Sequence, residues 1–109
     1  MTIKPVPMPE AAEGVSLLFR LPQIAAMERD LTERFGLEFG GRHLLAGFAD
    51  LNADCVAAGL KHGLRNPDGT SWQGDVDGID LPVINLAERL SLALSRALFG
   101  DDGKGDANA

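Results

Sequence analysis

Two histidines are the residues of this chain best suited to proton transfer or metal binding. His43 and His62 are 19 residues apart, and the pattern around them predicts one helix that holds them near its opposite ends. Side chains so far apart along a helix cannot share a metal ion or a proton, so we interpret both as surface or helix-end residues. A deep polar pocket that held His43 or His62 beside a carboxylate would favour a small enzyme or ligand-binding domain.

The single cysteine is a second candidate for chemistry. Cys55 falls on the apolar face of the same predicted helix, where a free cysteine behaves as a small apolar side chain. A nucleophilic cysteine needs a neighbour that stabilises its thiolate, and the adjacent Asp54 has the opposite effect. A lone cysteine forms no disulfide within the chain, which favours a reducing compartment. We predict no catalytic residue and no cofactor.

Acidic and glycine-rich segments resemble ligand sites only in part. Asp50, Asn52 and Asp54 alternate as calcium ligands do, but a helix turns residues two apart in different directions. The segment 75–80, DVDGID, lacks the full ligand set and the terminal glutamate of an EF-hand. The segment 34–42, RFGLEFGGR, matches no phosphate-binding motif. We predict no metal site and interpret the glycine-rich segment as a joint between helices.

Trp72 is the only tryptophan and lies in the predicted loop 65–80, which is rich in glycine and aspartate. Long loops in small domains are often functional or mobile. Two interpretations remain open. The indole could fold back as a lid over the helix ends, or it could anchor a protein partner, because tryptophan is enriched at binding hot spots.

Apolar residues at helical spacing predict three helices that would position these side chains. Glycine is expected to end the first and third helices, at Gly36 and Gly100, and Asn66-Pro67 to stop the second. The first helix has Ile24, Met27, Leu31 and Phe35 on one face, and the three helices are expected at about 22–35, 42–64 and 82–99.

Three glycines lie inside the second predicted helix. Gly47, Gly59 and Gly63 each weaken it by roughly 1 kcal/mol relative to alanine. They could instead permit the close approach of a neighbouring helix.

Two nonapeptides share five of nine residues: LPQIAAMER at 21–29 and LPVINLAER at 81–89. Proline suits the first turn of a helix, where its missing N–H is not needed. The two segments are either the same solution to starting a helix or the trace of an ancient duplication. Neither interpretation implies catalysis.

The N-terminal residues predict extended structure. The segment 15–21, VSLLFRL, alternates as a half-buried strand does, and its partner would be the segment around 3–6 or another copy of the protein. Prolines at 5, 7 and 9 predict a stiff, poorly packed arm over 1–14. We expect a single helical domain over 15–100 and a disordered tail over 101–109.

Composition supports a mainly α protein: a three-helix small domain with a short N-terminal β-strand or hairpin. The chain has 109 residues, 45% of them apolar, with one tryptophan, five phenylalanines and no tyrosine. The net charge of −6 argues against binding nucleic acid or anionic lipid. The N-terminus does not resemble a signal peptide and no apolar run is long enough to span a membrane, so we expect a cytoplasmic protein.

The segment 15–100 resembles the tail assembly chaperones of long-tailed bacteriophages, closest to the branch of prophages and gene transfer agents. Three segments carry the resemblance: a strand that runs into LPQIAAMERDLTERFG, a middle helix that ends in AAGLKHGLRNPDG, and a final helix LAERLSLALSRALFG. Members of that family often begin with a clear β-hairpin, whereas here a proline-rich arm stands in place of an obvious first strand.

The resemblance implies a protein without enzymatic activity that acts in the cytoplasm of a bacterial host. Such proteins bind the tape measure protein and the tail tube protein during tail morphogenesis and are absent from the finished particle. We predict partner-binding residues at Leu37, Phe39 and Trp72. The alternatives are a structural tail component that is retained in the virion, or a small ligand-binding domain. The sequence leaves a homo-oligomer open.

Overall fold

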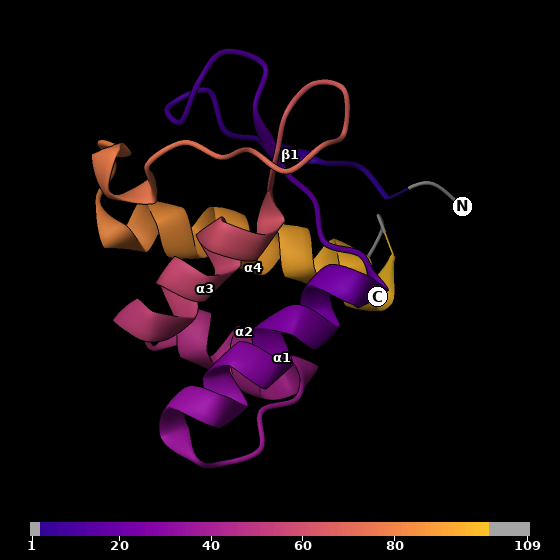
Figure 1. Ribbon diagram of the computed structural model, residues 1–109, viewed down its shortest axis with the longest axis vertical. Coiled ribbons are helices and arrows are strands. Elements are labelled where there is room, and N and C mark those ends of the chain that lie inside the picture. Colours follow the sequence, from indigo (N-terminus) through magenta and orange to yellow (C-terminus); the bar gives the residue numbers. More distant parts are fainter. Residues whose placement is uncertain (1–2, 101–109) are drawn as a thin grey trace, which may run out of the picture.

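The computed structural model describes residues 3–100, which form four α-helices and a small antiparallel sheet (Figure 1). The fold is mainly α with an N-terminal hairpin, as predicted, but it has one helix more than expected. The predicted tail, 101–109, lies outside the described residues. The elements in chain order are β1 (Val6–Pro7), β2 (Ser16–Leu17), α1 (Leu21–Phe35), α2 (Gly41–Ala49), α3 (Ala53–Gly63), β3 (Leu64–Arg65), the 3₁₀ helix η1 (Val76–Gly78) and α4 (Val83–Phe99).

The sheet joins the N-terminal hairpin to the end of α3. Val6 of β1 pairs with Leu17 of β2, and Leu17 pairs with Leu64 of β3, both in antiparallel register. The predicted strand therefore pairs with the chain's own N-terminal segment. The prediction that Leu64 is helical is wrong, because α3 ends at Gly63 and Leu64 has extended backbone angles.

The N-terminal arm is packed against the domain, so the predicted poor packing is wrong for its described part. Val6 is 5% exposed and Met8 is fully buried. The prolines that flank them hold the chain extended, so alternate side chains point inward while Pro5, Pro7 and Pro9 stay exposed.

Two arginines of α4 fix this arm. Arg89 forms a bidentate ion pair with Glu10, in which Nη2 lies 3.1 Å from Oε2. Arg96 Nη1 donates to the backbone carbonyls of Lys4 and Pro5 at 3.2 and 3.3 Å. The arm is thereby held along the last helix.

α1 begins directly after β2. Pro22 lies in its first turn, and the N–H of Arg20 donates to Gln23 Oε1 at 3.0 Å. Gly36 ends the helix with a φ of 71°, as predicted. The predicted face is buried at Ile24, Met27 and Leu31.

Leu21, the last apolar residue of the predicted strand 15–21, and Phe35, on the predicted face of the first helix, do not face the core. Leu21 is 78% exposed, because α1 starts at this residue and the strand alternation has already ended. Phe35 is 39% exposed, because it lies at the last turn of α1 and stacks on Phe39 in the following joint.

The second predicted helix is in fact two helices. The chain breaks at Leu51, whose φ of 57° is left-handed, and α3 restarts with Asn52 as its N-cap. The side chain of Asn52 accepts a hydrogen bond from Cys55 N–H at 3.1 Å. An asparagine whose side chain accepts a hydrogen bond from a free N–H of the first turn marks the start of a helix. The apolar pattern of the sequence continues across this position, so the start was not predicted.

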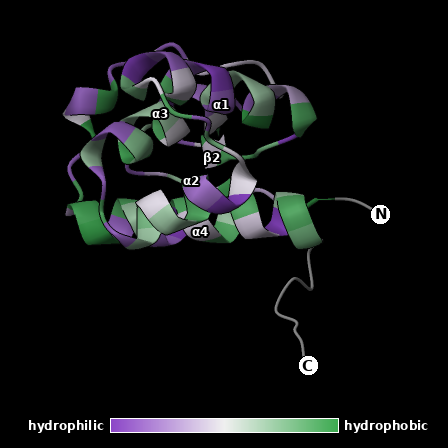
Figure 2. Cartoon of the chain, turned by 90° about the horizontal axis from the view of Figure 1, so that it is seen from below, coloured by the Kyte–Doolittle hydropathy of each residue, from purple (hydrophilic) through white to green (hydrophobic). Residues whose placement is uncertain are grey.

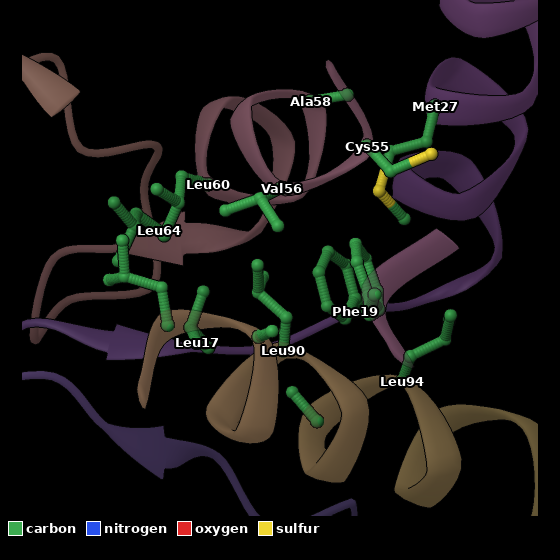
Figure 3. Packing of buried hydrophobic residues seen from close by; sticks show 14 of the residues in the cluster. Leu17, Phe19, Met27, Cys55, Val56, Ala58, Leu60, Leu64, Leu90 and Leu94 are labelled. Atoms are coloured by element: carbon green, nitrogen blue, oxygen red, sulfur yellow. The ribbon is translucent and has the colours of Figure 1, made fainter. Parts of the chain in front are cut away.

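The core lies where α3 and α4 meet the sheet. Figure 3 shows Phe19 between Val56 of α3 and Leu90 and Leu94 of α4. Gly59 permits the close approach that the sequence suggested, since a Cβ there would lie 2.8 Å from Leu90 Cδ2. Figure 2 shows the resulting layers, with α1 and α3 on one side of the molecule and α4 along the other.

Candidate functional site

Trp72 is held at the surface of α3 by its own loop. Its backbone N–H donates to the carbonyl of Leu64 at 3.0 Å, next to the antiparallel bridge between Arg65 of β3 and Ser71. The indole lies so close to Gly74 that a Cβ on that glycine would be 2.1 Å from Cζ2. Trp72 is half-buried and packs against the core, so it is both a cover for α3 and accessible to a partner.

The indole forms one wall of an open hollow between α1, α3 and the loop 72–76. Ala57 and Ala58 leave room beside it, because their side chains are small. The remaining lining residues are Asp30, Arg34, Asp54, Lys61, His62, Gln73, Gly74, Asp75 and Val76. The hollow thus combines one aromatic wall, small apolar residues and both signs of charge.

Two side-chain contacts, one of them an arginine–carboxylate ion pair, cross from α1 to α3 in this hollow. His62 Nε2 lies 3.3 Å from Asp30 Oδ2, with both side chains about a quarter exposed at 21% and 26%. Arg34 Nη1 lies 3.5 Å from Asp54 Oδ1, and this pair is much more exposed. Lys61 has no ion pair within residues 3–100, so its ammonium is open to a carboxylate from outside.

The His62–Asp30 pair is the arrangement that a small enzyme or ligand-binding domain would need. A carboxylate on one ring nitrogen fixes the imidazole and leaves the other nitrogen to bind a ligand or accept a proton. The residues that line the hollow include no serine, threonine or cysteine, so the pair has no hydroxyl or thiol to activate there. The side chains can hold a polar ligand or a charged partner group.

The other titratable candidates have structural roles. His43 lies at the start of α2, where its Nδ1 accepts a hydrogen bond from Gly40 N–H at 2.8 Å. His62 lies in the last turn of α3, so the helix-end interpretation is confirmed for both histidines, although they belong to two helices and not to one. Cys55 is buried, and burial together with the nearby Asp54 charge raises the pKa of its thiol, which opposes a nucleophilic role.

The acidic segments are local turn and cap structures. Asn52 caps α3, and the Asp75 carboxylate accepts a hydrogen bond from Asp77 N–H at 2.9 Å at the start of η1. Within residues 3–100, no three histidine, cysteine, aspartate or glutamate side chains are grouped so that they could hold a metal ion.

The other two predicted partner-binding residues lie elsewhere. Phe39 stacks on Phe35 with ring centroids 5.5 Å apart and packs against the core, while Leu37 is 68% exposed. Phe39 lines a second hollow, with Glu28, Glu33 and Glu38 among its neighbours, that shares no residue with the Trp72 hollow. The structure therefore splits the predicted set into two surfaces.

Sequence reasoning missed Asp30, Arg34 and Lys61 as site residues. Asp30 and His62 are 32 residues apart, and only the packing of α1 on α3 brings them together. One sequence feature could have indicated Asp30. It lies on α1 between the buried Met27 and Leu31, so its carboxylate is at the edge of the helix interface.

Comparison with known proteins gives no relative: no family model, no curated protein and no solved structure matches the chain. Among the described helices, none combines the length and the apolar character that crossing a membrane requires.

Proposed function

We propose that this chain is a non-enzymatic binding protein, a phage or prophage tail assembly chaperone that acts in the bacterial cytoplasm. It binds the tape measure and tail tube proteins while the tail assembles. The observation that carries the proposal is the Trp72 hollow, a preformed binding surface with an aromatic wall. The identity of the two partners comes from the resemblance of segment 15–100 to that family.

The composition of the hollow suits a protein segment. Trp72 offers a large apolar face to a side chain of the partner, and tryptophan is a frequent hot-spot residue in protein interfaces. Lys61 and the exposed Arg34–Asp54 ion pair surround that face with charges of both signs. A polar rim around an aromatic centre is the usual anatomy of a protein–protein interface.

A helical partner segment fits this surface best. An amphipathic helix places anchor side chains at spacings of three and four residues, so one turn can fill the space beside Trp72 while a carboxylate reaches Lys61. The acidic chain, with a net charge of −6, also favours basic side chains elsewhere on the partner.

The His62–Asp30 pair supports a second candidate function, a small ligand-binding domain. Its ligand would be a polar molecule held by the free imidazole nitrogen and stacked on Trp72. Nuclear magnetic resonance of labelled histidine distinguishes the two candidates. A small-molecule ligand would shift the His62 ring signals without any protein partner, whereas the chaperone proposal requires the tape measure protein.

Co-expression with the tape measure protein tests the main proposal. Wild-type chain should keep the tape measure protein in the supernatant and be recovered with it on affinity purification. Trp72→Ala should reduce the recovered partner at least tenfold, because a tryptophan hot spot contributes about 2 kcal/mol or more.

Val83→Ala is the matched control, because Val83 is an apolar residue 46% exposed and outside both hollows. It should leave recovery unchanged, and circular dichroism should show that both variants remain folded. Absence of binding by the wild-type chain would overturn the proposal. Recovery of the chain from purified particles by mass spectrometry would instead favour a retained structural component.

A further inference from the structure

Gly74 has backbone angles that do not require glycine. It lies in the loop before η1 and is not among the described glycines with a positive φ, so an alanine can adopt the same backbone conformation. The obstacle to a side chain at this position is the indole of Trp72. A Cβ on Gly74 would lie 2.1 Å from Cζ2 and 2.5 Å from both Cε2 and Cη2. Carbon atoms in favourable contact are about 3.5–4.0 Å apart.

The three distances also show how the ring lies on the glycine. Cζ2 is bonded to both Cε2 and Cη2, and the position of the absent Cβ is nearest to Cζ2 and equally far from its two neighbours. A position beyond the edge of the ring would be farther from those two neighbours than is observed. The Cβ direction of Gly74 therefore points at the face of the six-membered ring, and the indole lies flat against the main chain.

The main chain around Gly74 is held on both sides. Before it, the backbone N–H of Trp72 donates to the carbonyl of Leu64 at 3.0 Å. After it, the Asp75 carboxylate accepts a hydrogen bond from the first turn of η1, and Ile79 beyond η1 is 8% exposed in the core. A side chain at residue 74 would therefore displace the indole before it displaced the loop.

The indole is also free to move, unlike the neighbours of the other tightly packed glycines. A Cβ on Gly59 or Gly63 would meet Leu90 or Phe19, and both of these side chains are fully buried. Trp72 is half-buried and borders an open hollow. A substitution at residue 74 thus changes the position of one wall of the hollow and leaves the core in place.

We propose that Gly74 is a positioning residue, which fixes the Trp72 indole as the wall of the hollow by leaving the ring room to lie on the main chain. This inference rests on the proposed binding role of the hollow. Ala57 and Ala58 of α3 line the same hollow, so the position of the indole sets the width of the space that a partner side chain enters. A ring that is already fixed also loses little conformational freedom when the partner binds.

Tryptophan fluorescence of the full chain tests this positioning. Trp72 is the only tryptophan and the chain has no tyrosine, so the emission reports on this ring alone. Gly74→Ala should shift the emission maximum to longer wavelength and increase quenching by acrylamide, because the displaced ring contacts more water. An unchanged spectrum and unchanged quenching in a folded Gly74→Ala chain would overturn the inference.

Gly78→Ala is the matched control for the fluorescence measurement. Gly78 belongs to the same loop and also has no positive φ, but its Cβ would come no closer than 4.0 Å to a neighbouring atom, Asp75 Oδ2. This variant should leave the emission and the quenching as in wild type. The same change in both variants would overturn the inference, because it would show a general response of the loop.

A smaller ring at residue 72 should remove the effect of the alanine. The phenyl group of Trp72→Phe has no atoms at the positions of Cζ2 and Cη2, so it leaves space for a Cβ at residue 74. Gly74→Ala should lower the midpoint of chemical denaturation in the wild-type background and leave it unchanged in the Trp72→Phe background. An equal loss in both backgrounds would place the cost in the loop backbone and would overturn the inference.

Co-expression with the tape measure protein connects the position of the ring to binding. Gly74→Ala should reduce the recovered partner about tenfold, as the loss of a hot-spot contact does, and Gly78→Ala should not. Full recovery by a Gly74→Ala chain whose indole is displaced would overturn the positioning role.

Failure of this inference is distinguishable from failure of the proposed function, because fluorescence and denaturation use the chain alone. An indole that does not respond to Gly74→Ala overturns this inference even if the wild-type chain binds the tape measure protein. A wild-type chain that binds no tape measure protein overturns the proposed function and the binding role of the ring, whereas the dependence of the ring on Gly74 would stand.

Discussion

Gly63 shows how closely single residues are constrained at the centre of this fold. It is the last residue of α3, and its carbonyl accepts a hydrogen bond from Leu18 N–H at 2.9 Å. A Cβ at this position would lie 2.5 Å from Cε1 of Phe19, which is fully buried and surrounded by other core residues. The lack of a side chain is therefore what allows β2 to cross the end of α3.

We expect Gly63→Ala to destabilise the protein by about 1–3 kcal/mol, the usual cost of overpacking a core. The helix propensity of alanine offsets at most about 1 kcal/mol of this. Chemical denaturation measures the free energy of unfolding. The double variant Gly63→Ala with Phe19→Leu should lose less stability than the two single variants together, because the smaller side chain relieves the contact. Strict additivity would contradict the proposed clash.

Local sequence features predict the setting of some single residues and not of others. The apolar setting and acidic neighbour of Cys55 predicted a buried, unreactive thiol, and both are local features. His43 was predicted at a helix end, where it caps α2. His62 also lies at a helix end, in the last turn of α3. Its contact with Asp30 across two helices was not predicted, because no local pattern reveals it.

At the scale of elements, α1 and α4 follow from helical spacing and terminal glycine, whereas the break between α2 and α3 does not. Apolar residues continue through 44–60 as if in one helix, and the interruption rests on Leu51 in a left-handed conformation and on the Asn52 cap. Asn52 is a common N-cap residue, but in the sequence it also belongs to the alternating set Asp50, Asn52 and Asp54, which resembles metal ligands. β3 was missed because two residues are too few to show a strand pattern.

The arm and α4 are coupled through Glu10 and Arg89. The hydrogen bond from Arg89 is the main cause that lowers the pKa of Glu10 below its usual 4.5. The folded state therefore favours the ionised carboxylate, and its contribution to stability is present above pH 4.5 and is lost as the pH falls through the lowered pKa.

Glu10→Gln should remove this contribution at neutral pH and should make stability less dependent on pH between about 5 and 3. Thermal unfolding of wild type and variant across that range measures the effect. Glu13→Gln is the control, because Glu13 lies in the same exposed turn but forms none of the ion pairs described for α4. Identical pH profiles for wild type and Glu10→Gln would contradict this role of the pair.

At the scale of the whole molecule, the fold class was predictable and the assembly of the site was not. Composition and periodicity identify a mainly helical protein with an N-terminal hairpin. The site depends on how α1 crosses α3, which brings Asp30 to His62 and Arg34 to Asp54. Crossing geometry is a property of packed side chains and is not visible in spacing along one chain.

The predicted partner-binding residues Leu37, Phe39 and Trp72 also show that contacts made by packing are not visible in the sequence. A glycine-rich joint is expected to expose Leu37 and Phe39, and Trp72 lies in a polar loop. Leu37 is exposed as expected, but Phe39 stacks on Phe35 and packs on the core. The two hollows lie on different parts of α1, so one compact partner segment need not contact both.

Amide hydrogen exchange with and without the tape measure protein tests the central claim most directly. If the chain is a chaperone that uses the Trp72 hollow, binding should slow exchange at 57–62 and 72–76 and leave 83–90 of α4 unchanged. Slowed exchange confined to other segments, or none in the presence of a saturating partner, would contradict the account.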